Sequence, residues 1–148
     1  VVDKVVCLAL DPVYRSDGTR DEGRSHMWVD NEYIIDLRKE LPERVLFGAA
    51  VHPYDLKFED RVKKCIDEGA VLLKWLPSAQ QINRCDSRVM KALRFLATAC
   101  PGDKPLPLLL HNGPEYAIPT TDHRTKSYDY LCWSSWDNIV NFFRFGKK

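Results

Sequence analysis

VLFGAAVHPYDLKFEDRVKKCIDEGAVLLKWL, residues 45–76, decides the fold, because two apolar runs flank a segment with helical periodicity. The runs at 45–51 and 71–76 are short and continuous, which is typical of strands buried on both faces of a sheet. The segment 58–69 between them has an apolar stripe at helical spacing and ends on Gly69, a common helix terminator. This order predicts a right-handed βαβ crossover between two parallel strands.

The same alternation extends to both sides of this unit. Apolar runs at 5–10 and 107–110 predict one strand before it and one strand after it. Helical patterns cover 31–43, with Asp30 as a candidate N-cap, and 86–100. We therefore expect a single α/β domain with about four parallel strands and intervening helices.

Size and charge limit the function classes. The chain has 148 residues, which suits one domain with one hydrophobic core. Its 22 basic and 21 acidic side chains give a formal net charge of +1. Because proteins that bind nucleic acid or anionic membranes through charge carry a clear basic excess, we expect neither partner.

The cysteines indicate a reducing compartment. They are odd in number, widely spaced and form no C-x-x-C pair: Cys7, Cys65, Cys85, Cys100 and Cys132. This pattern argues against a disulfide framework and against a structural zinc knuckle. The opening run VVDKVVCLAL contains two charges and is too short for a signal-peptide core or a membrane span. We expect a cytoplasmic protein.

Polar side chains lie at the ends of the predicted strands. Asp11 follows the first strand, His52 the second and His111 the fourth, while Lys74 lies near the end of the third. Because ligands of parallel α/β folds bind at the carboxyl ends of the strands, these positions are candidate functional sites. Asp11 belongs to an Asp-Pro pair, for which capping a turn is the commoner role.

Three motifs resemble the amidohydrolase superfamily of metal-dependent hydrolases, particularly its amidohydrolase-related branch. They are AAVHPYD at 49–55, LLKWLPSAQ at 72–80 and LLLHNGPE at 108–115. The resemblance extends over residues 3 to 120 and implies the second to the fifth strand of a (β/α)8 TIM-type barrel. It therefore implies a partial barrel, and the chain is expected to be a fragment.

The resemblance also implies a site and a reaction. His111 matches the metal-binding histidine of the family's fifth strand, and Lys74 matches the fourth-strand lysine that binds metal once it is carboxylated. A divalent metal, zinc before manganese or iron, would activate a water that attacks a C–N or C–O bond of a small-molecule substrate. These two residues are the expected catalytic and metal-binding residues. The expected substrate-binding residues are His52, Trp75, Asn112 and Glu115.

The chain also departs from the family pattern. The family's H-x-H pair, its later histidine and its late aspartate have no counterpart. The histidines of this chain are His26, His52, His111 and His123. A hydrolytic zinc site needs three or four protein ligands. Whether the chain is an enzyme by itself, and whether it holds metal, therefore stays open.

Two other functions fit the same residues. One is a non-catalytic α/β domain that binds a partner or small molecule at the strand ends. The other is a barrel remnant whose exposed sheet edges need a complementary half-barrel or a second copy of the chain. Under these interpretations Lys74 extends its amine to water, His111 only ends a strand, and His52 has a structural role.

The last part of the chain follows a pattern of its own. Residues 1–120 form the barrel-like part of the single domain, and 121–148 form a divergent, aromatic-rich tail. Within the tail, Trp133, Trp136 and Phe143 recur at helical spacing, which predicts an amphipathic C-terminal helix. We expect this helix to cover an open edge of the sheet rather than to bind a partner or a membrane surface.

Overall fold

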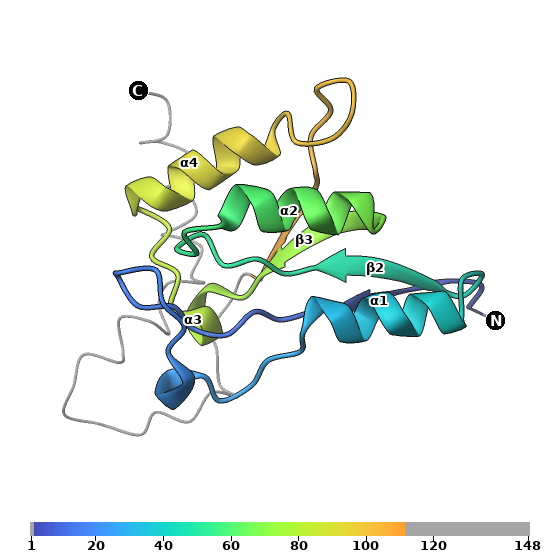
Figure 1. The fold of residues 1–148 in the computed structure, drawn as a ribbon, viewed down its shortest axis with the longest axis horizontal. Coiled ribbons are helices and arrows are strands. Elements are labelled where there is room, and N and C mark those ends of the chain that lie inside the picture. Colours follow the sequence, from blue (N-terminus) through green and yellow to red (C-terminus); the bar gives the residue numbers. More distant parts are fainter. Residues whose placement is uncertain (1, 112–148) are drawn as a thin grey trace.

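Four parallel strands form one sheet in the computed structural model, which describes residues 2–111 (Figure 1). The strands are β1 (Val5–Leu8), β2 (Val45–Ala49), β3 (Ala70–Trp75) and β4 (Leu108–Leu110), and they lie in the order β1-β2-β3-β4. The sheet is curled like half of a barrel. This arrangement confirms the expected α/β class and the expected four parallel strands.

The helices connect successive strands, as the sequence predicts. They are α1 (Asn31–Glu40), α2 (Phe58–Asp67) and α4 (Ser87–Leu96), with a short α3 (Pro77–Gln80) after β3 and a 3-10 turn η1 (Glu22–Arg24) after β1. Helix α1 ends at Glu40, just before Pro42, the expected stop, because the residue that precedes a proline is disfavoured in a helix. No helix within residues 2–111 is long and apolar enough to cross a membrane.

Two aspartates stand at helix starts, and only one caps its helix with its side chain. The Asp86 carboxylate accepts a hydrogen bond from the backbone N–H of Arg88 at 2.9 Å, as a capping residue of α4 should. Asp30 occupies the N-cap position of α1, but its side chain makes no capping bond and instead lies 3.4 Å from Arg20. The Asn31 side chain bonds to both backbone groups of Ala50, which anchors the start of α1 to the segment after β2.

The hydrophobic core lies between the sheet and its helices. Alternate strand residues point towards the helices, and the fully buried ones are Phe47, Ala49, Leu73 and Trp75. Helix side chains complete this layer, for example Phe58, whose ring centre lies 6.5 Å from that of Trp75 and 6.2 Å from that of Phe95. The core therefore fixes the strands by packing on one face of the sheet.

The other face of the sheet is apolar and only partly covered. We call it the open face, and its residues are Val6, Leu8, Leu46, Gly48, Leu72, Lys74 and Leu109. A Cβ atom on Gly48 would come within 3.2 Å of Val6, Leu8 and Leu72, so these side chains converge above the glycine. Even so, Val6, Leu8 and Leu109 keep 41%, 37% and 43% of their surface exposed.

Gly69 allows the tight turn between α2 and β3, and its replacement should be costly. Its φ is +79°, and a Cβ atom there would lie 2.9 Å from the Arg38 guanidinium. Gly102 has a similar φ of +75°, but a Cβ atom there would meet nothing within 4 Å. We expect Gly102→Ala to lower the free energy of unfolding by about 1 kcal/mol, the cost of a left-handed alanine. Gly69→Ala should cost more, because Arg38 must also move.

Urea denaturation of the two glycine variants measures this difference. Arg38 donates to the backbone oxygen of Glu68 at 2.7 Å, so moving its guanidinium also weakens this bond between α1 and the end of α2. Equal losses for Gly69→Ala and Gly102→Ala would show that Arg38 yields without cost and that backbone conformation alone matters.

Candidate functional site

The candidate residues gather at one rim, because all four strands run in the same direction. Asp11 and His52 each lie three residues beyond a strand, Lys74 is the last residue but one of β3, and His111 follows β4 directly. These residues form two groups. Asp11 and His52 belong to a buried network with α2 and α3, whereas Lys74 lies on the open face and His111 directly follows β4.

The carboxylate of Asp11 is the centre of the buried network. Its side chain is 3% exposed and accepts a hydrogen bond from the backbone N–H of His52 at 2.7 Å. Each of its oxygens also accepts a bond from the Arg61 guanidinium at 2.9 Å. The side-chain amide of Gln80 donates to the backbone oxygen of Asp11 at 3.1 Å. Asp11 therefore ties the segment after β1 to the segment after β2 and to two helices.

Arg61 of α2 pairs with two carboxylates at once. Besides Asp11, its Nη1 donates to Asp55 at 2.6 Å and to the Tyr14 hydroxyl at 2.9 Å. Burial by itself would lower the pKa of Arg61, but the bonds with Asp11 and Asp55 outweigh it and raise that pKa above its usual value. Burial, and then the charge of Asp11, raises the pKa of Tyr14 to about 12, so the hydroxyl keeps its proton near neutral pH.

His52 is fully buried, and the protein uses both of its ring nitrogens. Nδ1 accepts a bond from the backbone N–H of Tyr54 at 3.1 Å, so Nε2 carries the proton and donates to the backbone oxygen of Gln80 at 2.8 Å. The ring also stacks on Tyr14, with centroids 5.0 Å apart. Burial lowers the pKa of His52 to about 4 and keeps the ring neutral. This geometry fits the structural role, because a substrate would have to displace one of these bonds.

Lys74 lies near the end of β3, and His111 directly follows β4, the neighbouring strand. The register pairs Lys74 with Leu109, and His111 lies two residues further along β4's direction. The His111 backbone N–H donates to the backbone oxygen of Trp75 at 3.0 Å, which continues the ladder past the strand end. Burial lowers the pKa of the Lys74 ammonium. Within residues 2–111, Lys74 has no hydrogen bond or ion pair through its amine.

Trp75 points to the opposite side of the sheet from Lys74. It is 1% exposed, and its indole N–H donates to the backbone oxygen of Val51 at 2.8 Å. The indole thus joins β3 to the segment after β2 within the core. For the other two predicted substrate-binding residues, Asn112 and Glu115, the positions lie outside the described residues.

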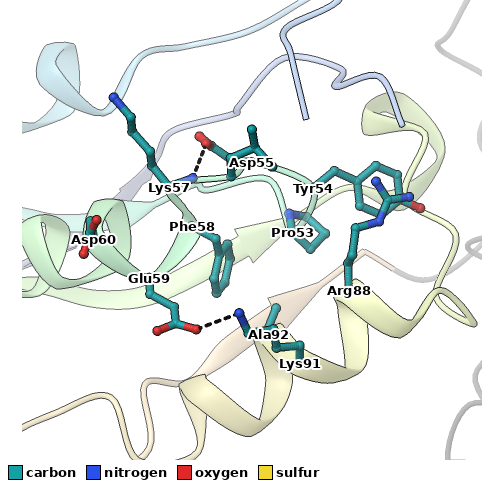
Figure 2. Close-up of a pocket in the computed structure, with 11 residues that line it drawn as sticks. Pro53, Tyr54, Asp55, Lys57, Phe58, Glu59, Asp60, Arg88, Lys91 and Ala92 are labelled. Atoms are coloured by element: carbon teal, nitrogen blue, oxygen red, sulfur yellow. Dashed lines mark hydrogen bonds and ion pairs between the residues drawn. The ribbon is translucent and has the colours of Figure 1, made fainter. Parts of the chain in front are cut away.

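A cavity of about 370 Å³ lies between the start of α2 and α4 (Figure 2). Its charged lining residues are Asp55, Lys57, Glu59, Asp60, Arg88 and Lys91. Lys91 pairs with Glu59 at 3.3 Å, and Arg88 lies over the Tyr54 ring at 3.6 Å. Since both signs of charge are present and partly paired, this lining selects neither anions nor cations. Neither Lys74 nor His111 lines the cavity.

No role was predicted from the sequence for three residues of the buried network. Arg61, Asp55 and Tyr14 lie in segments that read as a solvated helix face or as polar loops. Arg61 and Asp11 are 50 residues apart in the chain, so no local spacing connects them. The only available signal was that Asp11 and Asp55 both follow predicted strands, at an edge where charged side chains need partners.

No group of three or more His, Cys, Asp or Glu side chains within residues 2–111 is placed to hold a metal ion. Comparisons of this chain with protein-family models, with curated proteins and with solved structures find no match. The likeness to amidohydrolases therefore depends on the sequence motifs alone.

Proposed function

We propose that this chain forms part of a metal-dependent hydrolase of the amidohydrolase type, built on a partial TIM-type barrel. The observation that supports the proposal is that Lys74 and His111 lie at the carboxyl ends of the neighbouring strands β3 and β4. This rim is where parallel α/β barrels bind their substrates. The substrate would be a small molecule with a C–N or C–O bond that water can cleave.

The chemistry of these two side chains fits a zinc ion. A neutral imidazole and the oxygen of a carboxylated lysine are both zinc ligands. Carboxylation requires the neutral amine, and burial lowers the pKa of Lys74 in the direction that supplies it. Two ligands are fewer than the three or four of a hydrolytic site, so the remaining ligands would come from outside residues 2–111.

The residues of this chain would hold and orient the site. His111 would bind through a neutral ring nitrogen, and Lys74 through its carboxylate oxygen, on two strands held in register by the backbone ladder. The buried network of Asp11, Arg61 and His52 holds the segments after β1 and β2 together at the same rim. A bound divalent metal would supply a more acidic water and a polarised substrate carbonyl.

A second candidate function is a non-catalytic binding domain. One observation favours it: Asp11 and His52, two of the four strand-end groups, are fully engaged in bonds that stabilise the fold. In either case we propose a cytoplasmic location, since Cys7, Cys65, Cys85 and Cys100 are all free thiols.

Metal content distinguishes these two functions. We expect the purified 148-residue chain, incubated with zinc and bicarbonate, to retain zinc by elemental analysis, at close to one ion per chain, or one per two chains where two copies share a site. Lys74→Arg keeps the charge but cannot be carboxylated. It should weaken zinc binding by roughly tenfold or more, because losing even a residue that only hydrogen-bonds to a metal ligand has an effect of this size. His111→Ala should do the same.

His26→Ala is the matched control, because His26 lies in the loop after β1 and is not a predicted ligand. It should retain zinc as the unaltered chain does. Zinc binding that is absent from the unaltered chain, or that survives both Lys74→Arg and His111→Ala, would rule out the proposed site and leave the binding domain.

A further inference from the structure

We infer that two copies of this chain assemble edge to edge, so that their two four-stranded sheets close into one eight-stranded parallel barrel. Two features of the described structure lead to this inference. The open face is apolar and partly exposed, and within residues 2–111 neither β1 nor β4 pairs with a further strand on its outer edge. A second copy supplies the matching face and both matching edges together.

The outer edge of β1 presents backbone groups that a strand can bind. Val5 and Ala9 each donate their backbone N–H towards β2, at 2.8 Å. Because successive residues of a strand direct their backbone groups to alternate sides, Val6 and Leu8 direct theirs away from β2. Leu10 follows the same alternation and donates to Val29 at 2.9 Å, which ends the free edge just beyond the strand.

The outer edge of β4 is arranged in the same way. On its inner side, the backbone oxygen of Pro107 accepts a bond from β3 at 2.8 Å, and the backbone N–H of His111 donates to β3 at 3.0 Å. By the same alternation, Leu108 and Leu110 direct their backbone groups outward. Unpaired edges of this kind readily bind another strand.

A two-fold axis along the centre of the barrel satisfies both edges. It places β4 of each copy beside β1 of the other, and both new pairs are parallel because all four strands of each copy run in one direction. Eight is the number of strands at which side chains just fill a barrel interior. The open faces of the two copies, with Val6, Leu8, Leu72 and Leu109, would then form that interior.

The same assembly has a consequence for the zinc site, and this consequence rests on the proposed function. All eight strands of the closed barrel end at one rim, so Lys74 and His111 of the second copy would face the same opening as those of the first. The dimer would thus bring four donors to a rim at which one copy has two. Dimer formation itself requires no metal, and the two ideas can fail separately.

Sedimentation equilibrium of the full 148-residue chain, without added metal, tests the assembly. We expect a particle of twice the 17.1 kDa chain mass at micromolar concentration, which dissociates on dilution. A cooperatively melting particle of 17.1 kDa at all concentrations would overturn the inference and indicate that residues 112–148 or nothing covers the open face.

Two edge variants identify the surface. Val6→Pro removes an N–H that faces away from β2, so it should abolish the dimer while the β1·β2 ladder remains. Leu109→Lys places a charge on the open face and should also yield a 17.1 kDa particle. Leu56→Lys is the control, since Leu56 is 82% exposed and belongs to neither the open face nor an edge.

Circular dichroism melting shows whether each variant is folded, and Leu109→Lys decides the result if Val6→Pro does not fold. A dimer that persists in folded Leu109→Lys, or one that Leu56→Lys abolishes equally, would overturn the inference. His111→Ala separates the two ideas: it should lose zinc and remain a dimer. If the unaltered chain is dimeric but binds no zinc, the assembly stands and the proposed function falls.

Discussion

Replacing Arg61 with methionine is expected to lower the free energy of unfolding by about 3–5 kcal/mol, the usual cost of removing one partner of a buried ion pair. Methionine keeps most of the side-chain volume but leaves Asp11 with Arg20, 3.8 Å away, as its remaining cationic partner. The Asp11 side chain is 3% exposed, so water cannot replace the two lost bonds of 2.9 Å. Asp55 and Tyr14 lose a donor in the same substitution.

Lys64→Met is the matched control for this prediction, because Lys64 lies on the same helix and also forms an ion pair. Its bond to Glu32 is 2.9 Å long, but both side chains are more than 60% exposed. An exposed pair contributes between about 0 and 1 kcal/mol. Urea denaturation of both variants should therefore separate them clearly, and a loss below about 1 kcal/mol for Arg61→Met would mean that the network does not stabilise the fold.

Arg61→Lys refines the comparison. Lysine keeps the positive charge but cannot form the two parallel bonds that the guanidinium makes with Asp11. The free energy of unfolding of Arg61→Lys should therefore fall between that of Arg61→Met and that of the unaltered chain. A lysine as stabilising as arginine would show that charge alone, and not bond geometry, holds the network.

Lowering the pH from about 7 to about 4.5 is expected to destabilise the fold by about 2–3 kcal/mol through His52 alone. In the folded protein, burial lowers the pKa of His52 to about 4, whereas the pKa of an unfolded histidine is near its ordinary value of 6.5. Between these values the unfolded chain binds a proton that the folded chain does not. The stabilisation due to the neutral His52 is therefore fully present at a pH above the pKa of the unfolded chain. It decreases as the pH falls towards the pKa of His52 in the folded protein.

Several ionisable side chains surround the His52 ring. The neighbouring side chains are Asp11, Asp55, Arg61, Arg88, Tyr14 and Tyr54. Bonds from Lys57 and Arg61 overcome burial and lower the pKa of Asp55 below its ordinary 3.8, so its contribution is lost only at lower pH. The arginines and Tyr14 do not titrate below neutral pH.

Comparing the unaltered chain with His52→Asn isolates this effect. The asparagine can still accept the bond from Tyr54 but has no proton to gain, so its unfolding free energy should change far less over the same pH range. His26→Asn should keep the pH dependence of the unaltered chain. If His52→Asn shows the same pH dependence as the unaltered chain, the loss of stability must come from other residues.

The strands and the main helices could be predicted from the sequence because they depend on local patterns. The runs at 45–51 and 71–76, expected as strands, contain β2 and most of β3, and the segment 58–69 contains α2. Gly69 ends that helix unit with the positive φ that glycine tolerates. Helix ends were less predictable, since Asp30 caps nothing with its side chain and is drawn towards Arg20 instead.

The site residues were predictable only in part. Parallel strands bring their carboxyl ends to one rim whatever follows them, so the sequence could place Asp11, His52, Lys74 and His111 there together. It could not show what each of them contacts. The pairing of Asp11 with Arg61, and the use of both His52 nitrogens, depend on how α2 and α3 pack against the strand ends.

The sequence by itself determined the α/β class with its parallel strands. The spacing of apolar residues and the turn residues decide whether a segment forms a helix or a strand, and both can be recognised within a few neighbouring positions. Only the tertiary structure decided that His52 is enclosed while Lys74 lies on the open face of the sheet. The physical reason is that burial and pairing arise from contacts between segments distant in the chain. Arg61 and Asp11, 50 residues apart, meet only once the helix packs onto the sheet.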